Sequence, residues 1–355
     1  MPVRNFNNMN PPIRWGVIGS GGIARRRTIP EGILAAPNAK LIAVYDTQAA
    51  ANAEVACQFG AQPASSLAAL LEAGIDAVYL ASPPQFHCEQ TLQCAAAGKH
   101  VLCEKPLGLT VAEAETMIAA CQQQRVTLGT AFMMRFNTQH QAALRLIQEG
   151  QIGQPVFGRA QLSCWYPPLA GAWRQDPLAS GGGSLMDMGG HCIDLLEMFL
   201  GPVRTVSCFL NRAVHSYAVE DSALVSLQFA SGALGAVDAF FCMPDEVSQN
   251  RLELYGSQGG ILASGTIGQG AQGEMRFARK SAATGYDAQQ ARSGGENLAV
   301  NPAPINTYRA EIEEFSQALM EQREPANHAQ LGLQSQRVLA ACYASTNSGK
   351  HIQVQ

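Results

Sequence analysis

A glycine-rich segment near the start of the chain limits the fold more than any other feature. The pattern G-x-G-x-x-A is formed by Gly19, Ser20, Gly21, Gly22, Ile23 and Ala24. It directly follows the apolar run Ile13–Ile18 and precedes a helix-like stretch. Such glycines allow a tight turn and a close approach of the backbone to a pyrophosphate, which the helix N-terminus attracts. The pattern in this context predicts a dinucleotide-binding turn between a strand and a helix.

Further apolar runs alternate with helix-like stretches through the first third of the chain. The expected strands are Leu41–Tyr45, Asp76–Ala81, His100–Cys103 and Val126–Ala131. This rhythm predicts a parallel sheet with helices on both faces, in which ligands bind outside the carboxyl ends of the strands. The polar and proline residues that follow these strands are therefore candidate cofactor-binding residues. They are Asp46, Ser82, Pro83, His87, Glu104 and Lys105.

Asp46 bears on the choice of cofactor. It lies about 22 residues beyond Ala24, close to the usual offset of the acid that binds the adenosine ribose hydroxyls. No arginine or lysine follows it directly, which favours NAD. Against this, Arg25, Arg26 and Arg27 could hold the 2′-phosphate of NADP. A structural alternative is that Asp46 only caps the helix expected over Ala49–Phe59.

The stretch Ser180–Asp194 (SGGGSLMDMGGHCID) carries the strongest chemical signal. If a helix begins near Ser184, Asp187 and His191 lie four residues apart and share a face. A carboxylate beside an imidazole is a proton-handling pair. The alternative is a structural contact in a capped helix. Lys105 follows an apolar strand and precedes a proline, a position from which a lysine could hydrogen-bond a substrate oxygen.

The second half of the chain changes to closely spaced strands. These are Val156–Cys164, Val203–Asn211, Ala223–Phe229, Leu234–Phe241 and Arg251–Tyr255. The alternation within Ala223–Phe229 predicts an antiparallel sheet with one covered face, whose other face could form an interface. Residues 265–301 are expected to form a long loop or irregular hairpin, and Tyr308–Gln322 and Gln330–Asn347 to form closing helices. The expected division is a flexible arm over 1–12, a dinucleotide-binding domain over 13–135 and an α+β domain over 136–355.

Composition excludes several classes of protein. The net charge of −4 leaves no basic excess for nucleic acid, and no apolar run reaches the ~18 residues that span a bilayer. The polar N-terminal stretch lacks the apolar core of a signal peptide. The ten cysteines are scattered and never spaced C-x-x-C. We therefore expect a cytoplasmic protein without a metal site, nucleic-acid partner or membrane partner.

Three motifs together resemble a known family. The glycine pattern, the run AGKHVLCEKPL (Ala97–Leu107) and the run GGGSLMDMGGHCIDLL (Gly181–Leu196) are similar to the glucose–fructose oxidoreductase, inositol dehydrogenase and rhizopine-catabolism family (Gfo/Idh/MocA). The resemblance implies a Rossmann domain that binds NAD or NADP, and a second domain with a large open, mostly antiparallel sheet that forms a homodimer or homotetramer. It also implies hydride transfer between the nicotinamide and a secondary alcohol or ketone of a sugar, cyclitol or related polyol.

The resemblance also suggests roles for individual residues. Lys105 would orient the reacting hydroxyl, and Asp187 and His191 would complete a catalytic triad in which His191 is the general base during oxidation. Glu104 would contact the cofactor and His87 would line the nicotinamide pocket. Arg174, which lies in a stretch with Trp165, Tyr166 and Trp173, is a candidate cofactor or substrate contact.

Two sequence details and two rival functions complete the expectations. The triplets Ala172-Trp173-Arg174 and Val219-Glu220-Asp221 look most like 1,5-anhydro-D-fructose reductases, which tend to use NADPH and so oppose the interpretation of Asp46. One rival function is a glycoside-cleaving enzyme that retains its NAD and oxidises the sugar transiently. The other is a non-catalytic, cofactor-sensing regulator, which would have no need of Lys105, Asp187 and His191.

Overall fold

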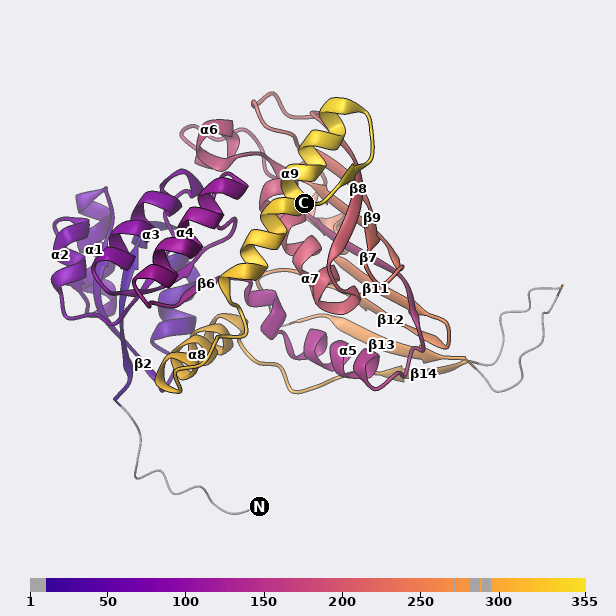
Figure 1. The fold of residues 1–355 in the computed structure, drawn as a ribbon, viewed down its shortest axis with the longest axis horizontal. Helices are drawn as coiled ribbons and strands as arrows, with labels where there is room; N and C mark the ends of the chain where they lie inside the picture. The colour runs from indigo at the N-terminus through magenta and orange to yellow at the C-terminus, as the bar shows by residue number, and fades with distance from the viewer. Residues whose placement is uncertain (1–10, 271, 281–287, 289–294) are drawn as a thin grey trace, which may run out of the picture. The chain divides into compact units, whose positions relative to one another are not determined.

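The computed structural model describes residues 11–270, 272–280, 288 and 295–355 (Figure 1). The arm expected over residues 1–12 therefore lies almost entirely outside the described residues. The chain forms two compact units. The first takes in the described residues up to Leu107 together with Glu113–Ala131 and Tyr308–Gln330. The second comprises Gly108–Ala112, Phe132–Thr307 and Leu331–Gln355.

The first unit contains a six-stranded parallel sheet. Its strands are β1 (Ile13–Ile18), β2 (Ala39–Tyr45), β3 (Gln62–Pro63), β4 (Ala77–Leu80), β5 (His100–Cys103) and β6 (Leu128–Thr130). They are arranged in the order β3-β2-β1-β4-β5-β6. In β1, the four consecutive residues from Trp15 to Ile18 are all buried, so both faces of the sheet are covered. The order reverses at β1 and β4, which is where a Rossmann sheet opens a crevice for its ligand.

Helices cover this sheet (Figure 1). They are η1 (Ser20–Ile33), α1 (Ala49–Phe59), α2 (Leu67–Glu72), η2 (Pro84–Phe86), α3 (His87–Ala96), α4 (Val111–Gln123) and α8 (Thr307–Met320). η1 departs from helical backbone angles at Gly22 and ends in a wide π-type turn, in which the Leu34 N–H donates to the Ile29 carbonyl at 3.0 Å. The parallel sheet with flanking helices is the architecture that the sequence predicts.

Helix α8 belongs to the first unit, although it lies some 290 residues beyond β1 in the chain. The rings of Phe315 and Trp15 have centroids 5.6 Å apart, and the Trp15 indole N–H donates to Ser316 at 3.1 Å. The apolar stripe of α8 thus completes the core around β1. One boundary was expected, at residue 135. In the structure, residues 308–330 belong to the first unit although they come after that boundary.

The second unit contains a nine-stranded sheet. Its strands are β7 (Pro155–Ser163), β8 (Val203–Asn211), β9 (Ser222–Phe229), β10 (Leu234–Phe240), β11 (Arg251–Gly256), β12 (Gly259–Ser264), β13 (Glu274–Arg279), β14 (Glu296–Ala299) and β15 (Ile352–Gln353). The order is β14-β13-β12-β11-β7-β10-β9-β8-β15. β10 runs parallel to β7, and the other described neighbours pair antiparallel. The predicted open, mostly antiparallel sheet is confirmed.

The longer helices of this unit lie along one face of the sheet (Figure 1). The helices are η3 (Met133–Phe136), α5 (Thr138–Gln148), η4 (Trp173–Gln175), α6 (Pro177–Ser180), η5 (Leu185–Gly189), α7 (Gly190–Leu200), η6 (Asp245–Val247) and α9 (Ala329–Ser348). In β9, Val225 and Leu227 are buried while Leu224, Ser226 and Gln228 are exposed. The predicted alternation is therefore confirmed, with one covered and one open face.

A long loop or irregular hairpin was expected over residues 265–301, and the strands β13 and β14 within that segment pair antiparallel. Residues 271, 281–287 and 289–294 of that segment lie outside the described residues. No helix among the described residues is long and apolar enough to cross a membrane.

Candidate active site

The glycine turn packs tightly at the carboxyl ends of β1 and β4. Gly19 has a φ of +75°, and its N–H donates to the Tyr45 carbonyl at 2.9 Å. A Cβ at Gly19 would lie 2.5 Å from the Ser82 nitrogen, so only glycine fits without moving backbone. Ala24, the small residue of the pattern, is fully buried. Gly21 and Gly22 are exposed and could be approached by a phosphate.

Asp46 links this turn to the next helix. Its carboxylate accepts the Gly21 N–H at 3.0 Å and the Gln48 N–H at 3.0 Å. It therefore orders the turn, contacts the backbone just before α1, and remains only half-buried. Of the neighbouring arginines, Arg25 pairs with Glu54 at 3.2 Å and Arg27 pairs with Glu31 at 2.8 Å. These pairs engage both side chains on the protein itself, which weakens the case that they hold a 2′-phosphate.

His87 connects the loops that follow β4 and β5. It is fully buried, with Nε2 at 2.8 Å from the Ser82 carbonyl and Nδ1 at 2.9 Å from the Pro106 carbonyl. Burial lowers the pKa of His87, and the carbonyls of Ser82 and Pro106 that face its two ring nitrogens act in the opposite direction. His87 thus holds the loop of Ser82 and Pro83 next to the E-K-P loop. Any influence on a nicotinamide would pass through those loops.

Glu104 is held by a residue that the sequence did not single out. The Tyr79 hydroxyl, in the middle of β4, donates to Glu104 Oε1 at 2.6 Å. Burial raises the pKa of Tyr79 well above its usual range, and the Glu104 carboxylate raises it further. Tyr79 therefore stays protonated and fixes Glu104 beside the half-buried Lys105. The backbone N–H of Lys105 donates to Glu104 Oε2 at 3.3 Å. A tyrosine within an otherwise apolar strand was the only available signal.

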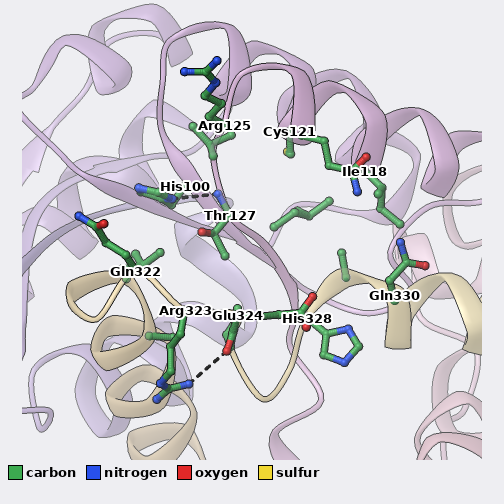
Figure 2. Close-up of a pocket in the computed structure, with 17 residues that line it drawn as sticks. His100, Ile118, Cys121, Arg125, Thr127, Gln322, Arg323, Glu324, His328 and Gln330 are labelled. Carbon is green, nitrogen blue, oxygen red and sulfur yellow. Dashed lines mark hydrogen bonds between the residues drawn. The ribbon is translucent and has the colours of Figure 1, made fainter.

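A cavity of about 610 Å³ in the first unit lies elsewhere (Figure 2). It is lined by His100 at the start of β5, by residues 125–128 leading into β6, and by the segment that follows α8. The imidazole Nδ1 of His100 accepts the Thr127 N–H at 2.9 Å. Because these are the amino ends of the strands, the cavity is not the cofactor crevice expected at the carboxyl ends.

Asp187 and His191 share the outward side of a buried segment in the second unit. From residue 182 to residue 196, these two are half-buried and every other residue is buried. Asp187 lies in η5, a single wide turn, and His191 lies in the first turn of α7. The Gly190 N–H closes the wide turn by donating to the Leu185 carbonyl. The regular helix expected from Ser184 is therefore replaced at its start by a π-type turn.

The structure brings Arg174 to Asp187. Arg174 Nε lies 3.3 Å from Asp187 Oδ2, and its guanidinium lies over the Trp173 ring at 4.3 Å from the centroid. A planar guanidinium suits this combination of stacking and pairing with a carboxylate. Arg174 therefore places a positive charge beside the Asp187 carboxylate. Spacing in the sequence gave no indication of this pair.

Asp194, on the helix that carries His191, pairs with Arg135. It is 2% exposed, and both of its carboxylate oxygens accept from Arg135 Nε at 2.9 Å. Burial raises the pKa of Asp194, and Arg135 opposes this rise. The pair ties α7 to η3 and so holds the helix that carries His191.

Aromatic side chains gather near the end of β7. The His215 ring lies 4.8 Å from Trp165 and 5.1 Å from Tyr217, centroid to centroid. Trp165 is 44% exposed, so its indole could contact the C–H face of a sugar. Asp221 holds this group from the backbone side. Its carboxylate accepts the backbone N–H groups of Ala213, Val214 and His215, each at 2.8 Å. Among the residues that the structure describes, no cluster of His, Cys, Asp or Glu could hold a metal ion.

Comparisons with known proteins agree with this architecture. Residues 13–132 match the oxidoreductase family with an NAD-binding Rossmann fold, and residues 140–262 match the GFO/IDH/MocA C-terminal domain. The 1,5-anhydro-D-fructose reductase of Ensifer adhaerens is 28% identical over 96% of this chain and 98% of that protein. The myo-inositol 2-dehydrogenase of Thermotoga maritima is 31% identical over 71% of this chain and 75% of that protein.

A solved structure shares the fold over almost the whole chain. The aldose-aldose oxidoreductase of Caulobacter crescentus, crystallised with glycerol, has a TM-score of 0.85 at 24% identity and covers 96% of this chain and 99% of its own. The two family models and the relative from Thermotoga maritima confirm the family expected from the three motifs. The chain belongs to the Gfo/Idh/MocA family of NAD(P)-dependent oxidoreductases.

Proposed function

We propose that this protein transfers hydride between a bound nicotinamide and a secondary alcohol or ketone of a sugar, cyclitol or related polyol. The observation that carries the proposal is the paired exposure of Asp187 and His191 within an otherwise buried segment. A carboxylate and an imidazole that are both partly exposed, in a chain with a dinucleotide-binding fold, have the chemistry that alcohol oxidation requires. The relatives named for reductases and dehydrogenases of sugars and inositols support the same class of substrate.

In this proposal, three side chains move or hold the hydroxyl proton. The nicotinamide, when bound, supplies or accepts the hydride. Lys105 hydrogen-bonds the substrate oxygen and favours its negative charge. His191 takes the hydroxyl proton in oxidation and returns it in reduction. Asp187, which pairs with Arg174, stabilises the positive charge that His191 gains with the proton.

The cofactor turn of the chain fits a dinucleotide. We propose that Gly19 to Ala24 hold the pyrophosphate, that Asp46 binds the adenosine ribose, and that the loops of Ser82, Pro83 and Glu104 flank the nicotinamide half. Tyr79 and His87 hold these loops from beneath. Trp165 and Arg174 are proposed to contact the substrate.

A cofactor titration followed by a substrate panel tests the function. We expect binding of NAD or NADP, and a change of nicotinamide absorbance with at least one sugar or polyol. Cleavage of glycosides with bound cofactor and no net redox change would favour the NAD-retaining glycoside-cleaving alternative. Cofactor binding without turnover of any kind would favour the regulator.

The Asp46 carboxylate should make NAD the preferred cofactor. Replacing Asp46 with alanine removes an acceptor for the ribose hydroxyls and also the acceptor of the Gly21 N–H in the turn, so binding of both cofactors should weaken. The loss for NAD should exceed the loss for NADP by about 10-fold, or about 1.4 kcal/mol. Fluorescence titration with both cofactors measures this ratio. Asp76→Ala is a matched control, because Asp76 pairs with Arg14 at the amino ends of the strands. An equal loss for both cofactors in the Asp46 variant would contradict this role.

We propose that the open face of the second sheet forms a homodimer or homotetramer. Phe209 on β8 is 73% exposed and lies directly opposite Leu224 on β9, and Leu234 on β10 is exposed on the same face. An apolar group of this kind on an open sheet face suits burial against a second copy. The free state of all ten cysteines fits the reducing cytoplasm, which we propose as the compartment.

Replacing both Phe209 and Leu224 with aspartate should shift the protein to monomer, because each charge would be desolvated in the proposed interface. Light scattering measures the change in mass. Leu178→Asp serves as the control, since Leu178 is 79% exposed on α6. A wild-type monomer, or an unchanged mass in the double variant, would rule out this interface.

A further inference from the structure

A single carboxylate oxygen receives three hydrogen bonds beside the segment that carries Asp187 and His191. Glu220 Oε1 accepts the Gly183 N–H at 2.8 Å, the Leu185 N–H at 3.1 Å and the Tyr343 hydroxyl at 2.9 Å. The backbone carbonyl of Glu220 also accepts the Ser184 N–H at 3.0 Å. These four bonds join the start of β9, the helix α9 and the turn η5.

The same contacts explain two glycines of the G-G-G-S sequence. A Cβ at Gly182 would overlap the Tyr343 hydroxyl, and a Cβ at Gly183 would overlap the Glu220 carbonyl oxygen. The backbone of the glycine segment is thus pressed against these two residues. The glycines therefore allow a close approach of the protein's own backbone and side chains.

The position of Glu220 suits the start of a helix. The first N–H groups of a helix have no acceptor within it, and a carboxylate near that end is favourable. Burial raises the pKa of Glu220, while the Tyr343 hydroxyl and the N–H groups lower it. Burial and the Glu220 carboxylate raise the pKa of Tyr343 well above its usual range, so Tyr343 keeps its proton and remains the donor.

We propose that Glu220, supported by Tyr343, is a positioning residue that fixes η5 and thereby the placement of Asp187 and His191. Leu185, whose N–H it binds, lies two residues before Asp187. Loss of the carboxylate would free this turn to shift along its axis or rewind as a regular helix. The proposal rests on the proposed function for its effect on turnover, but its structural part can be measured without any substrate.

The first arm of the test follows amide hydrogen exchange by NMR. In Glu220→Ala, the Gly183 and Leu185 amides should exchange at least about 10-fold faster, because their acceptor is gone. Glu220→Gln keeps a carbonyl oxygen and should stay within about 3-fold of wild type, and Tyr343→Phe should give an intermediate increase. Glu197→Ala is the matched control. Glu197 accepts the backbone N–H of Val203 at 2.8 Å and the side-chain amide of Gln334 at 2.9 Å, but it lies toward the far end of α7.

The second arm measures turnover on the substrate found in the panel. Glu220→Ala should lower kcat about 10–100-fold, as expected for a reacting group displaced by about an ångström, while cofactor affinity is retained and Glu220→Gln restores most of the rate. Glu197→Ala should lower Tm without this loss of kcat. Equal kcat in the two alanine variants, or unchanged exchange at Gly183 and Leu185, would overturn the proposal.

If wild type turns over nothing, the proposed function fails and the exchange arm alone decides whether Glu220 holds η5. If Glu220→Ala does not fold, Glu220→Gln and Tyr343→Phe carry both arms.

Discussion

Replacing His191 with alanine is expected to lower kcat by about 10²–10⁴-fold, the usual contribution of a general acid–base residue. Cofactor affinity should remain nearly unchanged, because the glycine turn and Asp46 lie in the first unit and His191 in the second. His191 is half-buried at the start of α7 and its ring meets Phe132 edge-on with 6.2 Å between centroids, so its removal takes away one aromatic contact as well as the imidazole. Steady-state kinetics and a cofactor titration on the same preparation measure both quantities.

His351→Ala is a matched control for His191→Ala, because His351 is an exposed imidazole near the C-terminus. It should leave both kcat and cofactor affinity unchanged. Normal turnover of the His191 variant would remove His191 from the mechanism. A loss of cofactor affinity with normal kcat at saturation would instead assign His191 to cofactor binding.

Gly19→Ala should have the largest effect among substitutions in the cofactor turn. A left-handed backbone costs alanine about 1 kcal/mol, and the new Cβ would also lie 2.5 Å from the Ser82 nitrogen and 2.7 Å from the Ala81 carbonyl carbon. Backbone atoms cannot rotate away as a side chain can. We expect a loss of about 2–4 kcal/mol in the free energy of unfolding, and cofactor binding weakened about 100-fold by the displaced turn.

Gly60 offers a matched control for Gly19. Its φ is +67°, and a Cβ there would meet no atom within 4 Å. Gly60→Ala should therefore cost only about 1 kcal/mol for its backbone conformation and leave cofactor affinity unchanged. Chemical denaturation and cofactor titration of the two variants compare them directly. Equal stability losses would show that the contact with Ala81 and Ser82 is relieved without cost.

Much of the fold could be predicted because its signals are local. Apolar runs ending in glycine or polar residues marked the strands, and β1 and β5 begin and end at the expected residues. The packing partner of α8 could not be predicted in the same way. Its apolar stripe is visible in the sequence, but nothing local indicates that Phe315 meets Trp15 rather than a neighbour in the chain.

The candidate site divides in a similar way. The joint exposure of Asp187 and His191 follows from their spacing, which a helix expresses locally. The wide turn η5 does not follow from spacing, and its Leu185 N–H is bound by Glu220, a residue from a distant segment that Tyr343 holds in turn. Arg174 and Asp187 likewise meet through loop geometry. Glu220 stood out in the sequence only as part of the triplet Val219-Glu220-Asp221, and nothing in that triplet indicates that its carboxylate meets Gly183, Leu185 and Tyr343.

Transfer of a labelled hydride tests the central claim most directly. A sugar or polyol that the panel identifies is prepared with deuterium on the reacting carbon, incubated with the protein and oxidised cofactor, and the recovered nicotinamide is weighed by mass spectrometry. We predict one deuterium in each reduced cofactor and a matching quantity of ketone. Cofactor recovered unlabelled and oxidised, while the sugar is consumed, would contradict net hydride transfer.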